Sequence, residues 1–336
     1  MDLLRFPYLV QKEILKNLKK AELFLLSLCS LRTTRMIQRV GGGGAKIERI
    51  CYFIVETTCY VNQKEKSCSN EETIMRIQNI YSSDTTNKRL EEINILGVKA
   101  YIEIPHSPGS KICVLNEKPD GPILEAIHKQ LGLIFGNHLE YSIYTNENSQ
   151  GKLLPILGNI KNSVIGISDS SRIYCLFQMS PYQESVKILP PIVGCLPPKS
   201  GFFNSNTLKM SNSEWMAHDI LNYFNGKRAF LKNAFILNTN IIQFLQKWIS
   251  NEKYQNLEVL SIDLMDPWSL NGKEIMNHFD FNQWNELEDI EIKHGNGDLY
   301  DLDSPTYIMR DFDRARATIA IEKNRFFFAK WNTNEA

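Results

Sequence analysis

The residue types that most often carry catalysis are scattered along this chain. Glu274 and His278 stand four positions apart, which would place both on one face of a helix. They lack the His-Glu-x-x-His pattern that binds catalytic zinc, so we expect an ordinary helix-surface pair rather than a metal site. The six histidines show no recurring spacing to cysteines or acidic residues: His106, His128, His138, His218, His278 and His294.

Three short segments match known functional motifs only in part. The Gly-Ile-Ser-Asp stretch ending at Asp169 lacks the second glycine of a Gly-x-Ser-x-Gly nucleophile elbow. The acidic stretch with Asp298, Asp301 and Asp303 lacks the glycine and final glutamate of a calcium-binding EF-hand loop, so we expect a solvated turn. The four glycines at 41–44 precede Ala-Lys-Ile-Glu instead of the Gly-Lys-Ser/Thr of a phosphate-binding loop, so we expect a linker.

These patterns predict a chain without intrinsic catalysis, cofactor or bound metal. The glycine motif of dinucleotide-binding folds is missing. Basic and aromatic residues are not interleaved as they are on an RNA-binding surface. An enzyme with an unrecognised site is a remote alternative, which a pocket holding two ionisable groups with opposed pKa shifts would support.

The composition is that of an ordinary globular protein, with 43% hydrophobic and 23% charged residues. The 38 basic and 38 acidic residues cancel, so no overall field favours nucleic acid or a membrane surface. Residues 1–50 nevertheless carry ten basic against four acidic residues, which suits an acidic protein partner. We expect neither a secretory signal nor a membrane span. Seven cysteines without a Cys-x-x-Cys pair favour a reducing compartment, so a cytoplasmic or nuclear protein is predicted.

Three short helices are expected in residues 6–40. Val10, Ile14 and Leu18 recur every four residues and therefore share one helix face. Pro7 suits the entry to that helix, and Ser30 is a suitable N-cap for the third helix. The polar face of the third helix carries three arginines: Arg32, Arg35 and Arg39.

The middle helix, expected over residues 22–29, is apolar on nearly every side. It contains Phe24, Leu25 and Leu28, with Ser27 as the one polar interruption. A helix that is apolar all round must be covered on two sides, and a domain of about forty residues covers only one of them. Because burying a Leu or Phe side chain is worth roughly 1.5–3 kcal/mol, we expect the second side to bind a partner.

Residues 45–336 are expected to form an α/β region. Its first part is predicted to contain a strand or strand pair at 46–61, a loop at 63–73, and a hairpin or bulged strand broken at Gly97 in 93–104. A strand at 111–115 and a helix at 122–131 that ends near Gly132 are predicted to follow. Further strands are predicted at 141–145, 164–168 and 174–179, before an extended loop at 190–198.

The clearest regularity begins near residue 208. Strand starts are expected at Leu208, Ala229, Glu258 and Glu288, at intervals of about 20 to 30 residues, with helices between them. This spacing is typical of strand-plus-helix units stacked side by side, as in leucine-rich-repeat arrays, although the asparagine ladder of standard repeats is missing. We therefore predict an irregular α/β array. An antiparallel hairpin within residues 305–334 is expected to cover its open edge.

The stretch from Phe6-Pro7-Tyr8-Leu9-Val10 to the Leu-rich run at 23–30 resembles the F-box of the nematode F-box families. That resemblance implies docking to a Skp-type adaptor within a cullin-based ubiquitin ligase of the SCF type. Eight residues would form or support the adaptor-binding surface, and their periodicity leaves open which of them face the adaptor and which face the internal core. They are Phe6, Pro7, Val10, Ile14, Leu18, Phe24, Leu25 and Leu28.

A second resemblance, over residues 208–264, is to the type-2 F-box-associated domain that follows the F-box in the same families. It is carried by Trp215 and by the stretches 229–233, 244–249 and 256–262. The tail is similar to the family's Arg-x-Asp-Gly turn and Ala-Thr strand. Here Arg-Asp-Phe-Asp-Arg at 310–314 lacks the glycine, so the turn geometry departs from that pattern.

Together the resemblances imply an F-box module with a glycine linker at 1–44 and a target-recognition region at 45–336. The chain would be a non-catalytic substrate-recognition subunit that binds the adaptor, through it a cullin, and an unknown target protein. The alternative is a repeat-type binding or scaffold protein that does not join a ligase. In the first case residues 1–45 should expose an apolar groove, and in the second they should be buried against the array as its cap.

Overall fold

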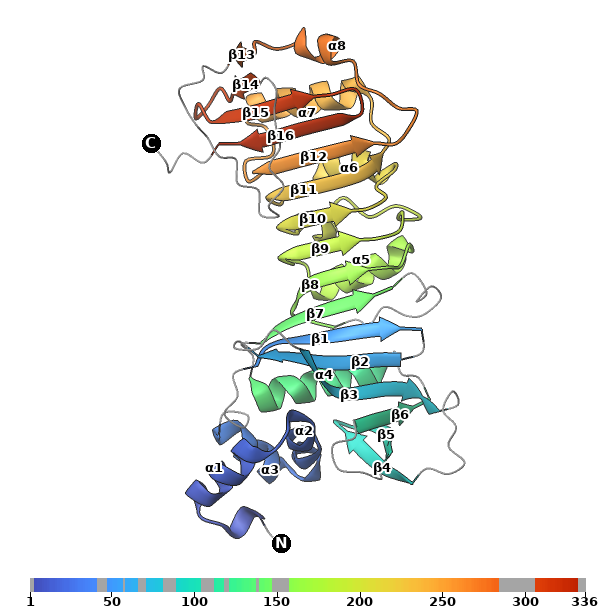
Figure 1. Cartoon of the computed structure of the whole chain (residues 1–336), viewed down its shortest axis with the longest axis vertical. Coiled ribbons are helices and arrows are strands. Elements are labelled where there is room, and N and C mark those ends of the chain that lie inside the picture. The colour runs from blue at the N-terminus through green and yellow to red at the C-terminus, as the bar shows by residue number, and fades with distance from the viewer. Residues whose placement is uncertain are drawn as a thin grey trace. The chain divides into compact units, whose positions relative to one another are not determined.

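The computed structural model describes residues 3–40, 47–56, 58–65, 71–80, 89–103, 112–117, 121–136, 139–146, 157–283 and 306–331. The chain is an α/β protein in which three N-terminal helices precede a mixed β-structure, as predicted (Figure 1). It divides into two compact units, Met1–Ile167 and Ser168–Ala336. The predicted glycine linker at 41–44 lies outside the described residues.

Unit 1 begins with the 3-10 helix η1 (Leu3–Arg5) and the helices α1 (Tyr8–Asn17), α2 (Lys20–Cys29) and α3 (Leu31–Arg39). Ser30 caps α3 as predicted: its Oγ accepts from the Thr33 amide at 3.2 Å, and its own amide donates to Thr33 Oγ1 at 3.1 Å. The expected polar face of α3 is also confirmed, because Arg32, Arg35 and Arg39 are all exposed.

The sheet of unit 1 has the strand order β8-β7-β1-β2-β3-β6-β5-β4. Its strands are β1 (Ile47–Val55), β2 (Thr58–Glu65), β3 (Glu71–Asn79), β4 (Leu90–Ile95), β5 (Val98–Glu103), β6 (Ile112–Asn116), β7 (Glu140–Thr145) and β8 (Ile160–Ile165). The β1–β2 pair is antiparallel, whereas β7 joins β1 in parallel. The predicted strand pair at 46–61 and the hairpin with Gly97 at its turn are confirmed.

Two predictions in unit 1 are wrong at the level of elements. The expected loop at 63–73 contains the end of β2 and the start of β3, because polar residues there pair across the two strands, as in Gln63 with Glu72. The helix α4 (Pro122–Phe135) continues through Gly132, since its face toward the core stays apolar as far as Ile134. Gly136, with φ +96°, ends the helix instead.

Unit 2 has the strand order β9-β10-β11-β12-β16-β15-β14-β13. Its strands are β9 (Ser185–Ile188), β10 (Thr207–Met210), β11 (Arg228–Ala234), β12 (Val259–Leu264), β13 (Asn282–Gln283), β14 (Thr306–Met309), β15 (Arg316–Ile321) and β16 (Arg325–Lys330). Its helices are α5 (Ser170–Met179), η4 (Gly201–Asn204), α6 (Met216–Tyr223), α7 (Asn238–Ile249) and α8 (Gly272–Met276). The strand predicted at 174–179 is wrong: Asp169 caps a helix there, and Ile173, Leu176 and Phe177 are buried at helical spacing.

Strands β9 to β12 are parallel neighbours, with α6 following β10 and α7 following β11. Strands β10, β11 and β12 begin within one residue of Leu208, Ala229 and Glu258, whereas the fourth predicted start, Glu288, lies outside the described residues. Strand β9 was not predicted, because its alternation of polar and buried apolar residues covers only four positions, too few to indicate a strand from sequence. The predicted spacing of strands and helices is confirmed for the three described strand starts, at β10, β11 and β12.

Two asparagines connect neighbouring strands of unit 2, although the asparagine ladder of standard repeats is missing from the sequence. Asn212 Nδ2 donates to the Leu189 carbonyl at 2.9 Å. Asn233 Nδ2 donates to the Ser211 carbonyl at 3.1 Å and to Asn212 Oδ1 at 2.8 Å. A short asparagine ladder thus ties the ends of neighbouring parallel strands to one another.

The antiparallel strands at the end of the chain cover the array edge as predicted, because β16 pairs with β12 and β15 pairs with β16. Phe326 and Phe328 of β16 pack edge-on against Phe244 of α7, and Phe328 also contacts Trp248. The turn between β14 and β15 forms without glycine, since Arg314 adopts the left-handed backbone conformation with φ +58°.

That turn contains an ion pair between a buried arginine and an exposed aspartate. Arg310 is 3% exposed, lies over the Trp248 ring at 5.3 Å from its centroid, and donates to both carboxylate oxygens of Asp313 at 2.9 and 2.5 Å. The hydrogen bonds from Arg310 hold the pKa of Asp313 well below its usual range. A carboxyl group with a depressed folded-state pKa stabilises the protein at neutral pH and loses that contribution on acidification.

We therefore expect Asp313→Asn to lower the free energy of unfolding at pH 7 by about 1–2 kcal/mol, since Asp313 itself is partly exposed. The loss of stability of the wild type between about pH 4 and pH 2 should be correspondingly smaller in the variant. Urea unfolding at several pH values measures both effects. Asp311→Asn, which removes an exposed carboxylate two residues away, is the matched control and should change neither.

Candidate docking surface on the N-terminal helices

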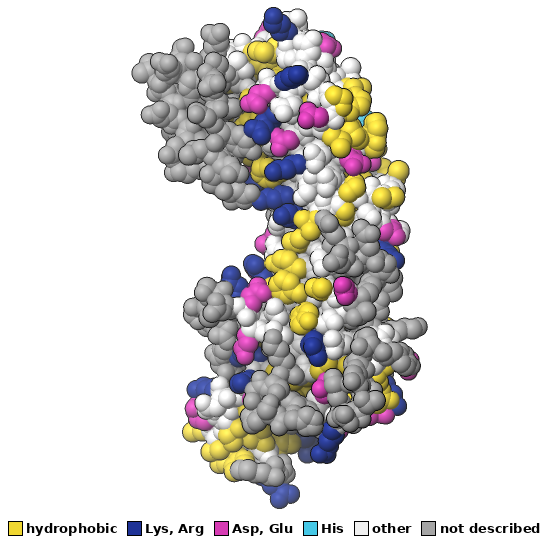
Figure 2. Space-filling view, turned by 45° about the vertical axis from the view of Figure 1, so that its right-hand side comes forward, with side chains coloured by type: hydrophobic (Ala, Val, Ile, Leu, Met, Phe, Trp, Pro, Cys, Tyr) yellow, Lys and Arg dark blue, Asp and Glu magenta, His cyan; other side chains and the backbone are white. Residues whose placement is uncertain are grey.

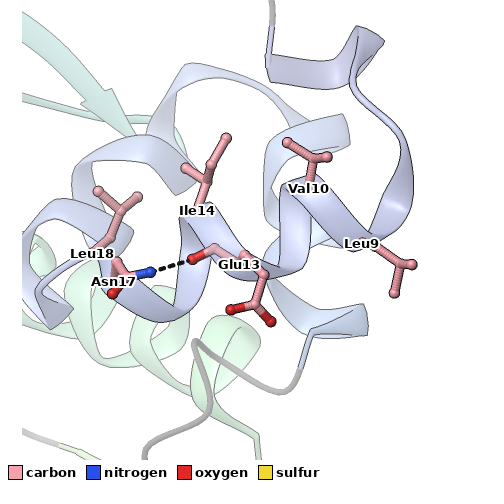
Figure 3. A pocket seen from close by; sticks show the side chains of 6 residues that line it. All are labelled: Leu9, Val10, Glu13, Ile14, Asn17 and Leu18. Carbon is pink, nitrogen blue, oxygen red and sulfur yellow. Dashed lines mark hydrogen bonds between the residues drawn. The ribbon is translucent and has the colours of Figure 1, made fainter.

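The first helix carries an open apolar groove. Six residues line about 580 Å³ of space along α1: Leu9, Val10, Glu13, Ile14, Asn17 and Leu18. Figure 3 shows Val10, Ile14 and Leu18 projecting from the same side of the helix, with Glu13 pointing away from them. The four-residue spacing seen in the sequence thus produces a single apolar face.

The rest of α1 explains why that face stays in solvent. Leu15 is the one residue of α1 that is buried, while Gln11, Lys12 and Ile14 are half-buried. Leu9 is 73% exposed and Val10 is 41% exposed. Gln11 fixes the entry to the helix, because its Nε2 donates to the Phe6 carbonyl at 2.8 Å. A cluster of large apolar side chains exposed on one helix is the kind of surface that binds a partner.

The eight adaptor-binding residues that the F-box resemblance implies differ in their exposure to solvent. Pro7 and Val10 are exposed, and five others are half-buried: Phe6, Ile14, Leu18, Leu25 and Leu28. Phe24 is fully buried together with Leu23, so it supports the surface from within and cannot contact a partner directly. Tyr8 and Leu9, which that set does not include, are exposed beside the groove. Their exposure has no signature in the sequence, since apolar residues on a short helix usually face the core.

The other side of the helical module is covered by unit 1 itself. Helices α2 and α3 pack against α4. Gln130 Nε2 of α4 donates to Ser27 Oγ of α2 at 2.8 Å, and Gln38 Nε2 of α3 donates to the Leu133 carbonyl at 2.7 Å. Ser27, the polar interruption of the Leu-rich helix, is therefore the hydrogen-bonding contact to α4. One side of α2 is enclosed, while Leu25 and Leu28 remain partly accessible.

Glu274, His278 and Asp169 are among the residues singled out for possible chemistry that the structure describes. Glu274 and His278 lie on the surface, where Glu274 accepts from Asn238 Nδ2 at 2.6 Å and His278 Nδ1 contacts the Glu274 carbonyl at 2.8 Å. Asp169 is the N-cap of α5. Within the described part of the chain, no group of three His, Cys, Asp or Glu side chains could hold a metal ion. The stretch around Asp298 to Asp303, and His106, His138 and His294, lie outside that part.

In the described part of unit 1, Tyr52, His128 and Tyr141 form a cluster of titratable groups under α4. Tyr52 Oη lies 2.9 Å from His128 Nδ1, and the His128 ring packs against Tyr141 with centroids 4.3 Å apart. Burial lowers the pKa of His128 to about 4 and raises the pKa of Tyr141 to about 12. Although the shifts have opposite directions, both favour the neutral form, and Tyr52 and Tyr141 are enclosed by the core. The cluster is a hydrogen-bonded part of the α4–sheet contact.

This cluster makes the stability of unit 1 depend on pH. Because His128 has a folded-state pKa of about 4 against roughly 6.5 in an unfolded chain, its contribution is intact above about pH 6.5 and is lost as the pH falls toward 4. The loss should be on the order of 3 kcal/mol. We expect His128→Gln to flatten the pH dependence of urea unfolding in that range, whereas His218→Gln, at an exposed position, should leave it unchanged.

No family model, curated protein or solved structure matches the chain. In the described residues, the helices are too short or too polar for any of them to cross a membrane.

Proposed function

We propose that the chain is the substrate-recognition subunit of an SCF-type ubiquitin ligase. Its N-terminal helices would dock a Skp-type adaptor and, through it, a cullin, while the later α/β region binds a target protein. Its contribution to ubiquitin transfer would be proximity, since holding a target next to the conjugating enzyme raises the effective concentration of the target lysines. The chain itself would perform no chemistry.

The observation that carries this proposal is the open apolar groove on α1. Val10, Ile14 and Leu18 form it, and Leu25 and Leu28 of α2 remain partly accessible. Leaving these side chains in water costs hydrophobic free energy, so a bound partner would stabilise the module. The resemblance of residues 6–30 to an F-box supports a Skp-type adaptor as that partner.

The alternative proposal is a repeat-type scaffold that never joins a ligase, and one observation favours it. The hydrogen bonds from Gln130 to Ser27 and from Gln38 to Leu133 fasten α2 and α3 to α4, as expected of a helical cap. The asparagine ladder of unit 2 is in keeping with the leucine-rich-repeat-like interpretation in either case.

Size-exclusion chromatography of the full chain with a purified Skp-type adaptor separates the two proposals. A ligase subunit should co-elute with the adaptor, and addition of a cullin should shift both to a larger complex. A scaffold should elute alone under the same conditions. Deletion of residues 1–45 is a poor substitute for this experiment, because removing α2 and α3 would expose the apolar surface of α4.

A further inference from the structure

Unit 2 carries a row of aromatic side chains at one edge of its parallel strands. Trp215 follows β10, Phe235 follows β11, and Trp268 lies four residues beyond β12. Their rings form a continuous row, with centroids 4.8 Å apart between Trp215 and Phe235 and 5.6 Å apart between Phe235 and Trp268. We call Trp215, Phe235 and Trp268 the aromatic row.

The aromatic row is exposed although its residue types favour burial. Trp215 is 69% exposed and Trp268 is 37% exposed, and Leu237 and Met265 in the same loops are exposed as well. Figure 2 shows hydrophobic side chains on the surface in the upper part of the view, where unit 2 lies. Packing of the fold does not require these rings in solvent, so their exposure points to a ligand.

Backbone hydrogen bonds hold the loops that carry the row. The Glu214 amide donates to the Asn233 carbonyl at 2.9 Å, and the Phe235 amide donates back to the Glu214 carbonyl at 3.2 Å. The Met265 amide donates to the Ala234 carbonyl at 3.2 Å. Each loop is thus bonded to its neighbour, and little ordering would be needed on binding, which favours affinity.

The charges in these loops select the kind of ligand. The stretches 211–215, 235–237 and 265–271 contain two charged residues, Glu214 and Asp266, and both are acidic. The nearest basic residues along the chain are Lys209 on β10, Lys232 on β11 and Lys273 on α8. Lys209 lies over the Phe230 ring, 5.5 Å from its centroid, and Lys273 is offset by Glu274 beside it. The faces of indole rings attract cations, and carboxylates nearby strengthen that preference.

We propose that the aromatic row, with Glu214 and Asp266, is a docking site for an extended, arginine- or lysine-bearing segment of a partner protein. Basic side chains would lie over the exposed Trp215 and Trp268 rings and pair with the two carboxylates. The assignment of this site as the target-recognition surface of a ligase subunit rests on the proposed function. Peptide binding itself requires no adaptor, so failure of either proposal is visible separately.

The test is calorimetric titration of the full chain at low ionic strength with a short peptide of alternating glycine and arginine. Binding should weaken at least about tenfold in Trp215→Ala/Trp268→Ala. Binding should also weaken in Glu214→Gln/Asp266→Asn, which leaves the rings in place. The affinity of this variant for the peptide should depend much less on salt concentration than that of the wild type. Tyr182→Ala, at an exposed aromatic outside the row, should bind as the wild type does.

Three results would overturn the inference. The arginine peptide could fail to bind, or bind the tryptophan variant as tightly as the wild type. A proline-alanine or glycine-glutamate peptide of the same length could bind equally well, which would show that charge does not select the ligand. Concentration-dependent dimerisation that the tryptophan substitutions abolish would show that the row is covered by a second copy of the chain.

Discussion

Val10→Asp combined with Ile14→Asp is expected to abolish co-purification of the chain with a Skp-type adaptor. Both side chains line the open groove of α1, and neither is buried in the unbound chain. In a complex, the two carboxylates would lie in an apolar interface without partners. If each costs about 1–3 kcal/mol, affinity falls by at least about thirtyfold. In the free chain the same carboxylates remain hydrated, so the fold should be retained.

The matched control is Met179→Asp, which introduces the same charge at an exposed apolar position of α5. It should bind the adaptor as the wild type does. Circular dichroism and urea unfolding should show that the double variant keeps its fold and most of its stability. A folded double variant that still binds the adaptor with unchanged affinity would remove α1 from the docking surface.

Phe328→Ala is expected to lower the free energy of unfolding by about 3–5 kcal/mol. Phe328 is fully buried on β16, with ring centroids 5.3 Å from Phe244 and 5.1 Å from Trp248. Truncation would leave a cavity between α7 and the antiparallel strands that close the array. Because β16 is the neighbour of β12, we expect the loss to affect the cooperative unfolding of the array strands rather than the chain end alone.

Urea unfolding followed by tryptophan fluorescence measures this effect, since Trp248 contacts the substituted ring. Phe312→Ala removes an aromatic ring that is 82% exposed in the preceding turn, and it should change stability by less than about 0.5 kcal/mol. Equal effects of the two substitutions would mean that β16 contributes little to the stability of unit 2.

The periodicity of apolar residues predicted the elements that are buried on one face. The three N-terminal helices, α7 and the β15–β16 hairpin were predicted correctly as elements. In α3 and α7 the apolar spacing agrees with burial, whereas the regular apolar face of α1 stays accessible. The strand predicted at 174–179 was wrong because a short apolar run fits a buried strand and a helix equally well, and the cap at Asp169 decides between them.

The side-chain contacts between neighbouring strands of unit 2 could not be predicted from local patterns. Asn212 lies just after β10 and Asn233 near the end of β11, and nothing in either local stretch shows that the two side chains meet. Arg314 takes the conformation for which glycine was expected, and the Arg310–Asp313 pair fixes that turn. Both depend on residues brought together by the fold.

The candidate docking surface was predicted in composition but not in orientation. Val10, Ile14 and Leu18 share a face as their spacing predicts, yet the sequence does not show whether that face meets protein or solvent. Phe24 and Leu25 are adjacent in an apolar helix, and only the packing of α2 on α4 distinguishes the buried ring from the accessible Leu. The aromatic row was missed because its three members come from separate loops, far apart in the sequence.

The most direct test of adaptor docking is hydrogen–deuterium exchange of the full chain with and without a purified Skp-type adaptor. The amides of α1 in the free chain should exchange faster than those of α4, since α1 has one buried residue and α4 has eight. With adaptor bound, we predict slower exchange over residues 8–18 and over the accessible part of α2, with unit 2 unchanged. Exchange over residues 8–18 that is the same in both states, at adaptor concentrations that saturate a known F-box protein, would contradict the proposed docking surface.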